Sequence, residues 1–331
     1  MTEAQIAETK QVLSMICQSC PNPVLIGFGG SIAYGTSTDT SDVDIRGIYV
    51  NPIEEFIGMQ ADSEQFKPDG YDCVIYSIKK MFKLLADCNP NTIELLGLTP
   101  DQILLCSGAG QDIYNSAKLF LSKKAGDSFG CYARAQLNRL TNKLGRTDSN
   151  SIVDNETRSI SNAITALRKK DGIQGLSAQN DNGTLFITVN GHYSIDKFCR
   201  LTGEISNIHN DYKRSVRNDK AIVHGKIGKH MMHLVRLYLM GIDILKDQRI
   251  TTLRPEHDLL MDIRNGCYFE DDQVTPNAAF NKLVQELSKE FDAALKSSTL
   301  PDTPDMTKIN ALMMECVKQE LGISIDPNIQ L

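Results

Sequence analysis

The chain contains no tryptophan, and only 6% of its 331 residues are aromatic. A long platform on which successive bases of a single strand stack needs many aromatic side chains, so the composition disfavours such a surface. Apolar runs of about 18 residues or more are also absent, which excludes a membrane-spanning helix. The opening residues MTEAQIAETK lack the basic start and apolar stretch of a secretory signal, so we expect a cytoplasmic protein.

Positive charge is scarce as well. The chain has 35 Lys and Arg residues against 41 Asp and Glu residues, and its net charge of −6 argues against a protein that wraps long duplexes. The 9 cysteines, an odd number at scattered positions, are typical of reduced cytosolic thiols. With 41% apolar and 23% charged residues, the composition excludes a disordered or fibrous protein.

Residues 1–110 alternate short apolar runs with helical segments. Three apolar runs predict buried strands, at Val24–Phe28, Val43–Val50 and Tyr71–Tyr76, and Ile103–Cys106 predicts an edge strand. Ser77 suits the N-cap of a helix that follows the third strand. We therefore predict a mixed α/β core over residues 1–110.

Residues 111–331 are dominated by helical periodicity. Helices are predicted over the ranges 112–122, 128–144, 155–170, 226–246, 256–265, 277–296 and 305–321. One interruption, Thr184–Val189, lies between the turn signals Asp181-Asn182-Gly183 and Asn190-Gly191. It predicts a small hairpin near 184–195 within an otherwise α-helical second domain over residues 111–331.

The turn after the first predicted strand carries Gly30-Ser31. Glycine lets the backbone approach a ligand closely, and the start of a helix offers free N–H groups to phosphate oxygens. Ser31 adds a hydroxyl donor. A lone Gly-Ser turn before a helix usually has no binding role, so a functional interpretation depends on the neighbouring residues.

Three aspartates that follow this turn are candidate ligands for divalent metal ions. Asp42 and Asp44 stand at the start of the second predicted strand, where alternation directs both side chains to one face. Paired carboxylates are hard oxygen ligands for Mg²⁺ or Mn²⁺. Asp72, on the third strand, joins them if the two strands are neighbours, and three carboxylates suit a two-metal site.

This order of features resembles a known superfamily. Gly30-Ser31, followed eleven residues after Ser31 by Asp-x-Asp, is similar to the signature of the DNA polymerase beta-like nucleotidyltransferases. The segment GGSIAYGTSTDTSDVDIRGIYV, residues 29–50, resembles in particular the predicted nucleotidyltransferases associated with RNA ligases in RNA repair gene clusters. Further resemblance lies in NPNTIELL (89–96), YARAQLNRL (132–140), KHMMHLVRLYLMGIDILKDQRI (229–250) and IRNG (263–266).

The resemblance implies an enzyme that moves a nucleoside monophosphate from an NTP to an acceptor hydroxyl and releases pyrophosphate. Asp42 and Asp44 would bind two Mg²⁺ or Mn²⁺ ions, and Asp72 would complete the acceptor-side ion and help to deprotonate the attacking hydroxyl. Gly30 and Ser31 would hold the β- and γ-phosphates. Arg46 would contact a phosphate or the acceptor, with a structural salt bridge to a carboxylate as an equal alternative.

A cationic stripe is predicted on the helix that begins near residue 226. Lys226, Lys229, His233 and Arg236 recur at helical spacing on one face, which would neutralise a triphosphate, although such a stripe is more often a solvated surface. The resemblance favours the phosphate role for Lys229. Ile227, Met231, Leu234 and Tyr238 form another face, which we expect to pack. His230 and His233 are a weak signal for zinc without a nearby Cys pair.

The acceptor is open at the level of the sequence. Between Arg200 and Arg236, 8 Lys and Arg residues accompany 3 Asp and Glu residues, whereas Pro301–Leu331 has 2 bases and 5 acids. Segregated charge permits a local site for an RNA end, such as that of a tRNA. The alternatives are nucleotidylation of a protein or small molecule, and an inactive nucleotide-binding regulatory protein. The choice of NTP, the number of nucleotides added, the oligomeric state and the role of residues 173–200 are not determined.

Overall fold

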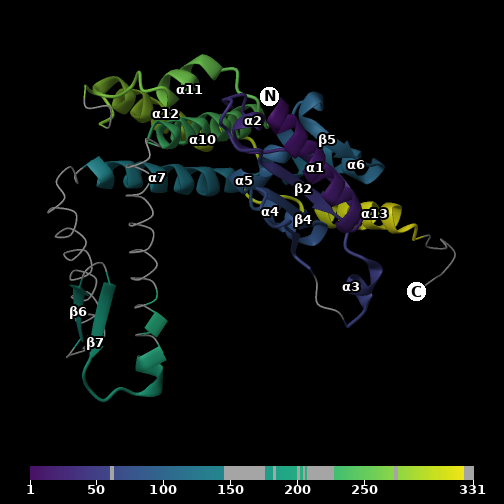
Figure 1. Cartoon of the computed structure of the whole chain (residues 1–331), viewed down its shortest axis with the longest axis horizontal. Helices are drawn as coiled ribbons and strands as arrows, with labels where there is room; N and C mark the ends of the chain where they lie inside the picture. Colours follow the sequence, from purple (N-terminus) through teal and green to yellow (C-terminus); the bar gives the residue numbers. More distant parts are fainter. Residues whose placement is uncertain are drawn as a thin grey trace. The chain divides into compact units, whose positions relative to one another are not determined.

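A mixed sheet of five strands, in the order β3-β4-β2-β1-β5, organises the N-terminal part of this computed structural model (Figure 1). β2 (Ile45–Tyr49) pairs in parallel with β4 (Cys73–Ser77). The other pairs are antiparallel and involve β1 (Pro23–Phe28), β3 (Gln65–Phe66) and β5 (Ile103–Cys106). The mixed α/β core and its predicted strands are thus confirmed.

The structure describes residues 1–59, 63–144, 176–181, 184–199, 202–203, 206, 227–271 and 275–323. It divides into two compact units. Unit 1 comprises Met1–Gln136, Met231–Phe269 and Pro276–Leu331, and unit 2 comprises Leu137–His230 and Glu270–Thr275. The division at residue 110 was drawn by role, between a catalytic core and a substrate-binding domain. That assignment of roles stays a prediction.

Two strand starts differ from the prediction in a way that matters for the aspartates. β2 begins at Ile45 and β4 at Cys73. Asp42 and Asp44 therefore precede β2 instead of opening it, and Asp72 directly precedes β4. Burial still alternates before β2, because Val43 is buried while Asp42 and Asp44 are not. The shared face of the two aspartates stays a prediction.

Several helices and 3₁₀ turns connect and flank the strands of unit 1. Their bounds are α1 Glu3–Ser19, α2 Gly30–Ala33, α3 Ile53–Ile57, α4 Ile78–Ala86, α5 Pro90–Ile93, α6 Gly108–Asn115, and the 3₁₀ turns Glu94–Gly97, Pro100–Gln102 and Ala117–Phe120. Helix α1 starts in a capping box between Thr2 and Gln5. The Gln5 amide also donates to the carbonyls of Thr38 and Ser41, which ties α1 to the loop before Asp42.

The predicted helix over 112–122 is instead the end of α6 and the 3₁₀ turn Ala117–Phe120, and further helices follow it. They are α7 Lys124–Leu144, α10 Ile227–Asp247, α11 His257–Arg264, α12 Ala278–Ser297 and α13 Met306–Leu321. Helix α13 packs against α4 and α6, which explains why unit 1 includes both ends of the chain. The predicted helix over 155–170 lies outside the described residues. None of the described helices is long and apolar enough to cross a membrane.

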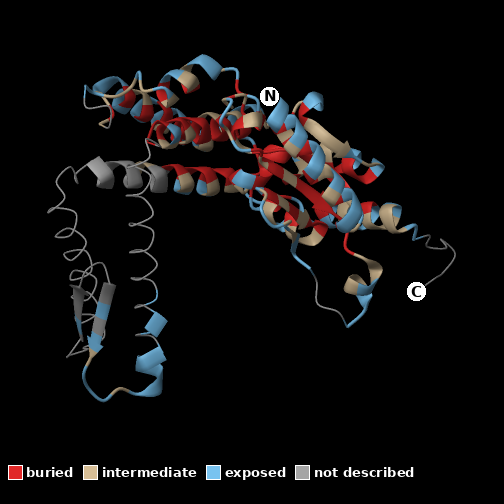
Figure 2. Cartoon of the chain, in the orientation of Figure 1, coloured by how far each residue is buried: buried red, intermediate tan, exposed pale blue. Residues whose placement is uncertain are grey.

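Buried side chains gather in the strands and along α10 (Figure 2). The predicted packing face of α10 is confirmed, since its four members, Ile227, Met231, Leu234 and Tyr238, are all buried. Unit 2 contains a hairpin in which β6 (Leu176–Asp181) is antiparallel to β7 (Thr184–Val189). The predicted position near 184–195 is wrong for one strand, because the partner of Thr184–Val189 precedes it in the chain instead of following it.

Candidate active site

Two of the predicted catalytic aspartates meet at one end of the β2–β4 pair. Parallel pairing aligns Ile45 with Cys73, so the preceding residues, Asp44 and Asp72, are also neighbours. The Ile45 amide donates to the Asp72 carbonyl at 2.9 Å, which extends the ladder by one step beyond the strands. The predicted convergence required the second and third predicted strands to be neighbours, and β2 and β4 are neighbours in the sheet.

Arg46 lies against both carboxylates. Its Nη2 donates to Oδ1 of Asp72 at 2.8 Å and to Oδ1 of Asp44 at 3.4 Å. Its Nη1 donates to the carbonyls of Ile45 and Asp72, at 2.9 and 3.0 Å. The salt-bridge alternative for Arg46 is therefore what the structure contains, and it holds the two aspartates side by side.

The charge environment of Asp72 follows from this geometry. Partial burial raises its pKa, but a hydrogen bond shared with the Asp44 carboxyl group and the adjacent Arg46 guanidinium outweigh that effect. The pKa of Asp72 consequently lies below its usual value. Burial acts to lower the pKa of Arg46, but the carboxylates of Asp72 and Asp44 outweigh burial and raise it.

The Gly30 turn approaches Asp44 closely. The Gly29 amide donates to the Asp44 carbonyl at 2.8 Å, and Gly30 adopts a φ of +54°. A Cβ atom at Gly30 would overlap Oδ2 of Asp44. Only glycine satisfies both the left-handed backbone and this contact. Ser31, the next residue, is buried at 7% exposure.

The donor set has the chemistry of a divalent-cation site. Asp44 and Asp72 offer adjacent hard oxygen ligands, and the Arg46 guanidinium already provides a positive charge at both. Asp42 is exposed. Across the described residues, no group of three His, Cys, Asp or Glu side chains is arranged to hold a metal ion. The carboxylate pair fits such an ion, and Asp42 would have to move to complete the predicted trio.

A comparison with known families bears on this geometry. The profile of RlaP, the RNA repair pathway DNA polymerase beta family, matches residues 22–315. The match includes the Gly30 turn and all three aspartates. The chain belongs to the RlaP family. The family is of the DNA polymerase beta-like nucleotidyltransferase type, which supports an enzyme.

One curated relative of this RlaP-family chain is an uncharacterized 38.9 kDa protein encoded in the nrdC-mobD intergenic region of Enterobacteria phage T4. The two are 33% identical over 91 residues, which are 24% of this chain and 27% of the phage protein. The chain thus matches about a quarter of the length of that relative.

The structure does not place all members of the predicted cationic stripe on an exposed helix face. Arg236 was expected on the stripe, but it is fully buried, and its Nη1 pairs with Oε2 of Glu94 at 3.3 Å. Helical spacing cannot separate a buried cation from an exposed one, and the partner carboxylate lies far away in the sequence. Lys229 is exposed in unit 2, and Lys226 lies outside the described residues. Their phosphate role stays a prediction.

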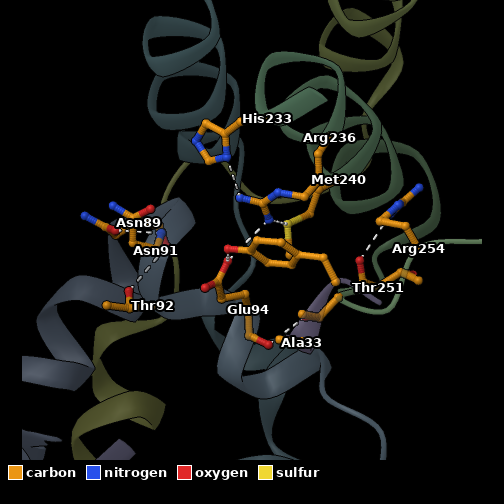
Figure 3. Close-up of polar contacts among 12 residues, drawn as sticks. Ala33, Asn89, Asn91, Thr92, Glu94, His233, Arg236, Met240, Thr251 and Arg254 are labelled. Carbon is orange, nitrogen blue, oxygen red and sulfur yellow. Dashed lines mark hydrogen bonds and ion pairs between the residues drawn. The ribbon is translucent and has the colours of Figure 1, made fainter. Parts of the chain in front are cut away.

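His233 is half-buried one turn before Arg236. Its Nδ1 lies 3.1 Å from Nη2 of Arg236 (Figure 3). A guanidinium group only donates, so Nδ1 accepts and the proton of the neutral ring resides on Nε2. The His233 ring also meets the Tyr132 ring edge to face, with centroids 6.0 Å apart. The structure thus fixes the tautomer of His233.

Glu94 was missed by sequence reasoning. It is 5% exposed and accepts hydrogen bonds from Arg236 and from the Tyr34 hydroxyl, the latter at 2.8 Å. The available signal was a single carboxylate in the apolar segment NPNTIELL, which the family resemblance had already singled out. Tyr34 is itself buried in unit 1.

Proposed function

We propose that this protein is a metal-dependent nucleotidyltransferase that adds a nucleoside monophosphate from an NTP to a hydroxyl at an RNA end. The observation that carries the proposal is the meeting of Asp44 and Asp72 beside the Gly30 turn in a chain of the RlaP family. The paired carboxylates offer the negative charge that binds the cations of such a transfer.

The proposed transfer forms one phosphorus–oxygen bond and breaks another. The acceptor oxygen forms a bond to the α-phosphorus of the NTP, while the bond from that phosphorus to the bridging oxygen of pyrophosphate breaks. The hydroxyl proton passes to the Asp72 carboxylate. When bound at Asp42, Asp44 and Asp72, Mg²⁺ or Mn²⁺ supplies positive charge that offsets the triphosphate during in-line displacement.

Several groups of the chain are proposed to contact the phosphates. We assign the β- and γ-phosphates to Gly30 and Ser31, and a phosphate or acceptor contact to Arg46. To contact a phosphate, Nη2 of Arg46 would give up its hydrogen bond to the Asp72 carboxylate and donate to a phosphate oxygen instead. A guanidinium group donates well to carboxylate and to phosphate oxygens. Lys226, Lys229 and His233 are assigned to the nucleotide because they are the remaining cationic or polar members of the predicted stripe.

An RNA end is the proposed acceptor. The RlaP family belongs to an RNA repair pathway, and basic residues concentrate between Arg200 and Arg236 although the whole chain is acidic. A short contact with a terminus suits a chain with few aromatic residues better than a long stacking groove. A cytoplasmic location agrees with the many free thiols among the described cysteines.

The deciding experiment offers each of four α-labelled NTPs with Mg²⁺ or Mn²⁺ to the full chain, together with total RNA and total protein. We expect label on RNA and release of one pyrophosphate for each nucleotide added. Asp44→Asn should abolish both. Asp302→Asn is the matched control, because Asp302 is an exposed aspartate paired with Lys123. Label on protein alone would refute the RNA acceptor, and no pyrophosphate from any NTP would refute the enzyme.

A further inference from the structure

A buried cluster of three side chains lies in unit 1 outside the carboxylate site. Arg236, Glu94 and Tyr34 are 0%, 5% and 8% exposed. Glu94 Oε2 accepts from both the Tyr34 hydroxyl and Nη1 of Arg236, and Figure 3 shows Glu94 and Arg236 directed at each other. The Arg236 guanidinium also stacks on the Tyr34 ring, with its carbon 3.5 Å from the ring centroid. Each member thus contacts the other two.

The cluster is not explained by stability alone. Burying a carboxylate and a guanidinium costs several kcal/mol for each ion, so a buried pair is often no more stable than apolar side chains of similar volume. The Nε atom of Arg236 adds to that cost, since it is buried and has no hydrogen-bond partner in the described part of the chain. A costly buried pair calls for a second contribution, such as fixing one arrangement of the elements that it joins.

The elements joined by the cluster are far apart in the sequence. Glu94 begins the 3₁₀ turn after α5, and Arg236 lies on α10, 142 residues later. Both belong to segments that carry family resemblance outside the catalytic motif, NPNTIELL and KHMMHLVRLYLMGIDILKDQRI. Their meeting point is Tyr34, which ends α2.

Through Tyr34 the cluster reaches the proposed phosphate turn. The Tyr34 amide donates to the Gly30 carbonyl at 3.2 Å, which closes the single turn of α2. The Gln102 side chain donates to the carbonyls of Ile32 and Ala33, at 3.3 and 3.0 Å. The far end of the turn is fixed by the contact of Gly30 with Asp44. A four-residue helix has little stability of its own, so these anchors determine its position.

Tyr34 is suited to a permanent anchor. Burial raises its pKa well above 10, and the nearby carboxylates of Glu94 and Asp44 raise it further against the effect of Arg236. The phenol therefore remains a hydrogen-bond donor over the ordinary pH range.

We propose that Tyr34, Glu94 and Arg236 are positioning residues that hold the Gly30–Ala33 turn against Asp44 in the conformation that receives the nucleotide phosphates. The part that concerns phosphates rests on the proposed function. The anchoring of the turn does not, because it follows from contacts within the chain. The two parts can therefore be tested separately.

The first test is Tyr34→Phe, which removes the hydroxyl and keeps the ring that stacks on Arg236. We expect hydrogen exchange of the backbone amides at positions 34 and 36 to become at least about tenfold faster in this variant. These two amides donate to the carbonyls of Gly30 and Ser31 in the turn. Tyr114→Phe is the matched control, since that hydroxyl donates to the Leu98 carbonyl and not to the cluster. Unchanged exchange at these amides in Tyr34→Phe would overturn the anchoring.

The second test uses pyrophosphate release. Tyr34→Phe should raise the KM for NTP about tenfold and leave kcat within about twofold, because a loosened turn weakens phosphate binding. In a Glu94→Gln background the same substitution should add little, since the hydroxyl acts through Glu94. A fall in kcat at constant KM, or additive effects on KM, would overturn the positioning role. A wild-type protein that releases no pyrophosphate refutes the proposed function, and the exchange test still decides the anchoring.

Discussion

Gly30 and Asp44 occupy neighbouring space so closely that a methyl group at position 30 would overlap the Asp44 carboxylate. The contact joins the two parts of the family motif, the Gly-Ser turn and the Asp-x-Asp pair. It is made possible by the left-handed φ of Gly30 and by the bond from the Gly29 amide to the Asp44 carbonyl. The geometry of Asp44 and of the turn therefore cannot change independently.

Gly30→Ala should damage both activity and stability. The left-handed backbone costs a non-glycine residue roughly 1–2 kcal/mol, and the overlap displaces Asp44. We expect pyrophosphate release to fall by at least about 100-fold, which corresponds to about 2.7 kcal/mol of lost transition-state stabilisation. Gly70→Ala separates the two causes, because Gly70 has a φ of +83° and no atom within 4 Å of a Cβ position. Full activity in Gly30→Ala would refute the importance of the contact.

Removing the charge of Arg46 should raise the pKa of Asp72. In the folded protein this pKa is below its unfolded value, so the stabilisation is present above about pH 4 and is lost as the pH falls through the folded pKa. Arg46→Met should shift the Asp72 titration upward, as measured by carboxyl-carbon NMR. Asp72 is 54% exposed, so we expect its pH-dependent contribution to unfolding to be below about 1 kcal/mol. An unshifted titration would contradict the role of Arg46.

Breaking the buried pair should destabilise unit 1 strongly. Glu94→Ala leaves the Arg236 guanidinium buried without its carboxylate, which should cost about 3–5 kcal/mol in urea unfolding. The double variant Glu94→Leu/Arg236→Met removes both charges and should be less destabilised than Glu94→Ala. Glu290→Ala is the control, because Glu290 and Lys246 form an exposed pair worth at most about 1 kcal/mol. Equal losses in Glu94→Ala and Glu290→Ala would show that the buried pair has no special cost.

Divalent-ion binding should depend on all three aspartates. We expect Mn²⁺ affinity, followed by the electron paramagnetic resonance of free Mn²⁺, to fall at least about tenfold in Asp42→Asn, Asp44→Asn and Asp72→Asn. The Asp302→Asn control should bind like the wild type. Chelation by EDTA should stop pyrophosphate release without unfolding the chain, and added Mg²⁺ or Mn²⁺ should restore it. If Asp42→Asn alone binds normally, the site consists of the Asp44–Asp72 pair.

Local patterns were sufficient for much of the fold. The apolar run Val24–Phe28 became β1, helical spacing located α10 and its packing face, and the turn signals around Thr184 marked the hairpin. Each of these depends on contacts or burial within a few residues, which periodicity and turn chemistry record directly. The first residues of β2 and β4, Ile45 and Cys73, were less predictable. The sequence of an extended polar segment does not show whether its backbone pairs with a neighbouring strand.

By itself, the sequence determined the ingredients of the site: a glycine turn, an Asp-x-Asp pair and a further aspartate, in the order of a nucleotidyltransferase motif. Only the tertiary structure decided which of them meet. Parallel pairing of β2 with β4 brings Asp72 to Asp44, and packing of α10 places Arg236 on Glu94 instead of on a solvated stripe. Both outcomes depend on contacts between distant segments, and the burial of a charge is set by the partner that the fold supplies.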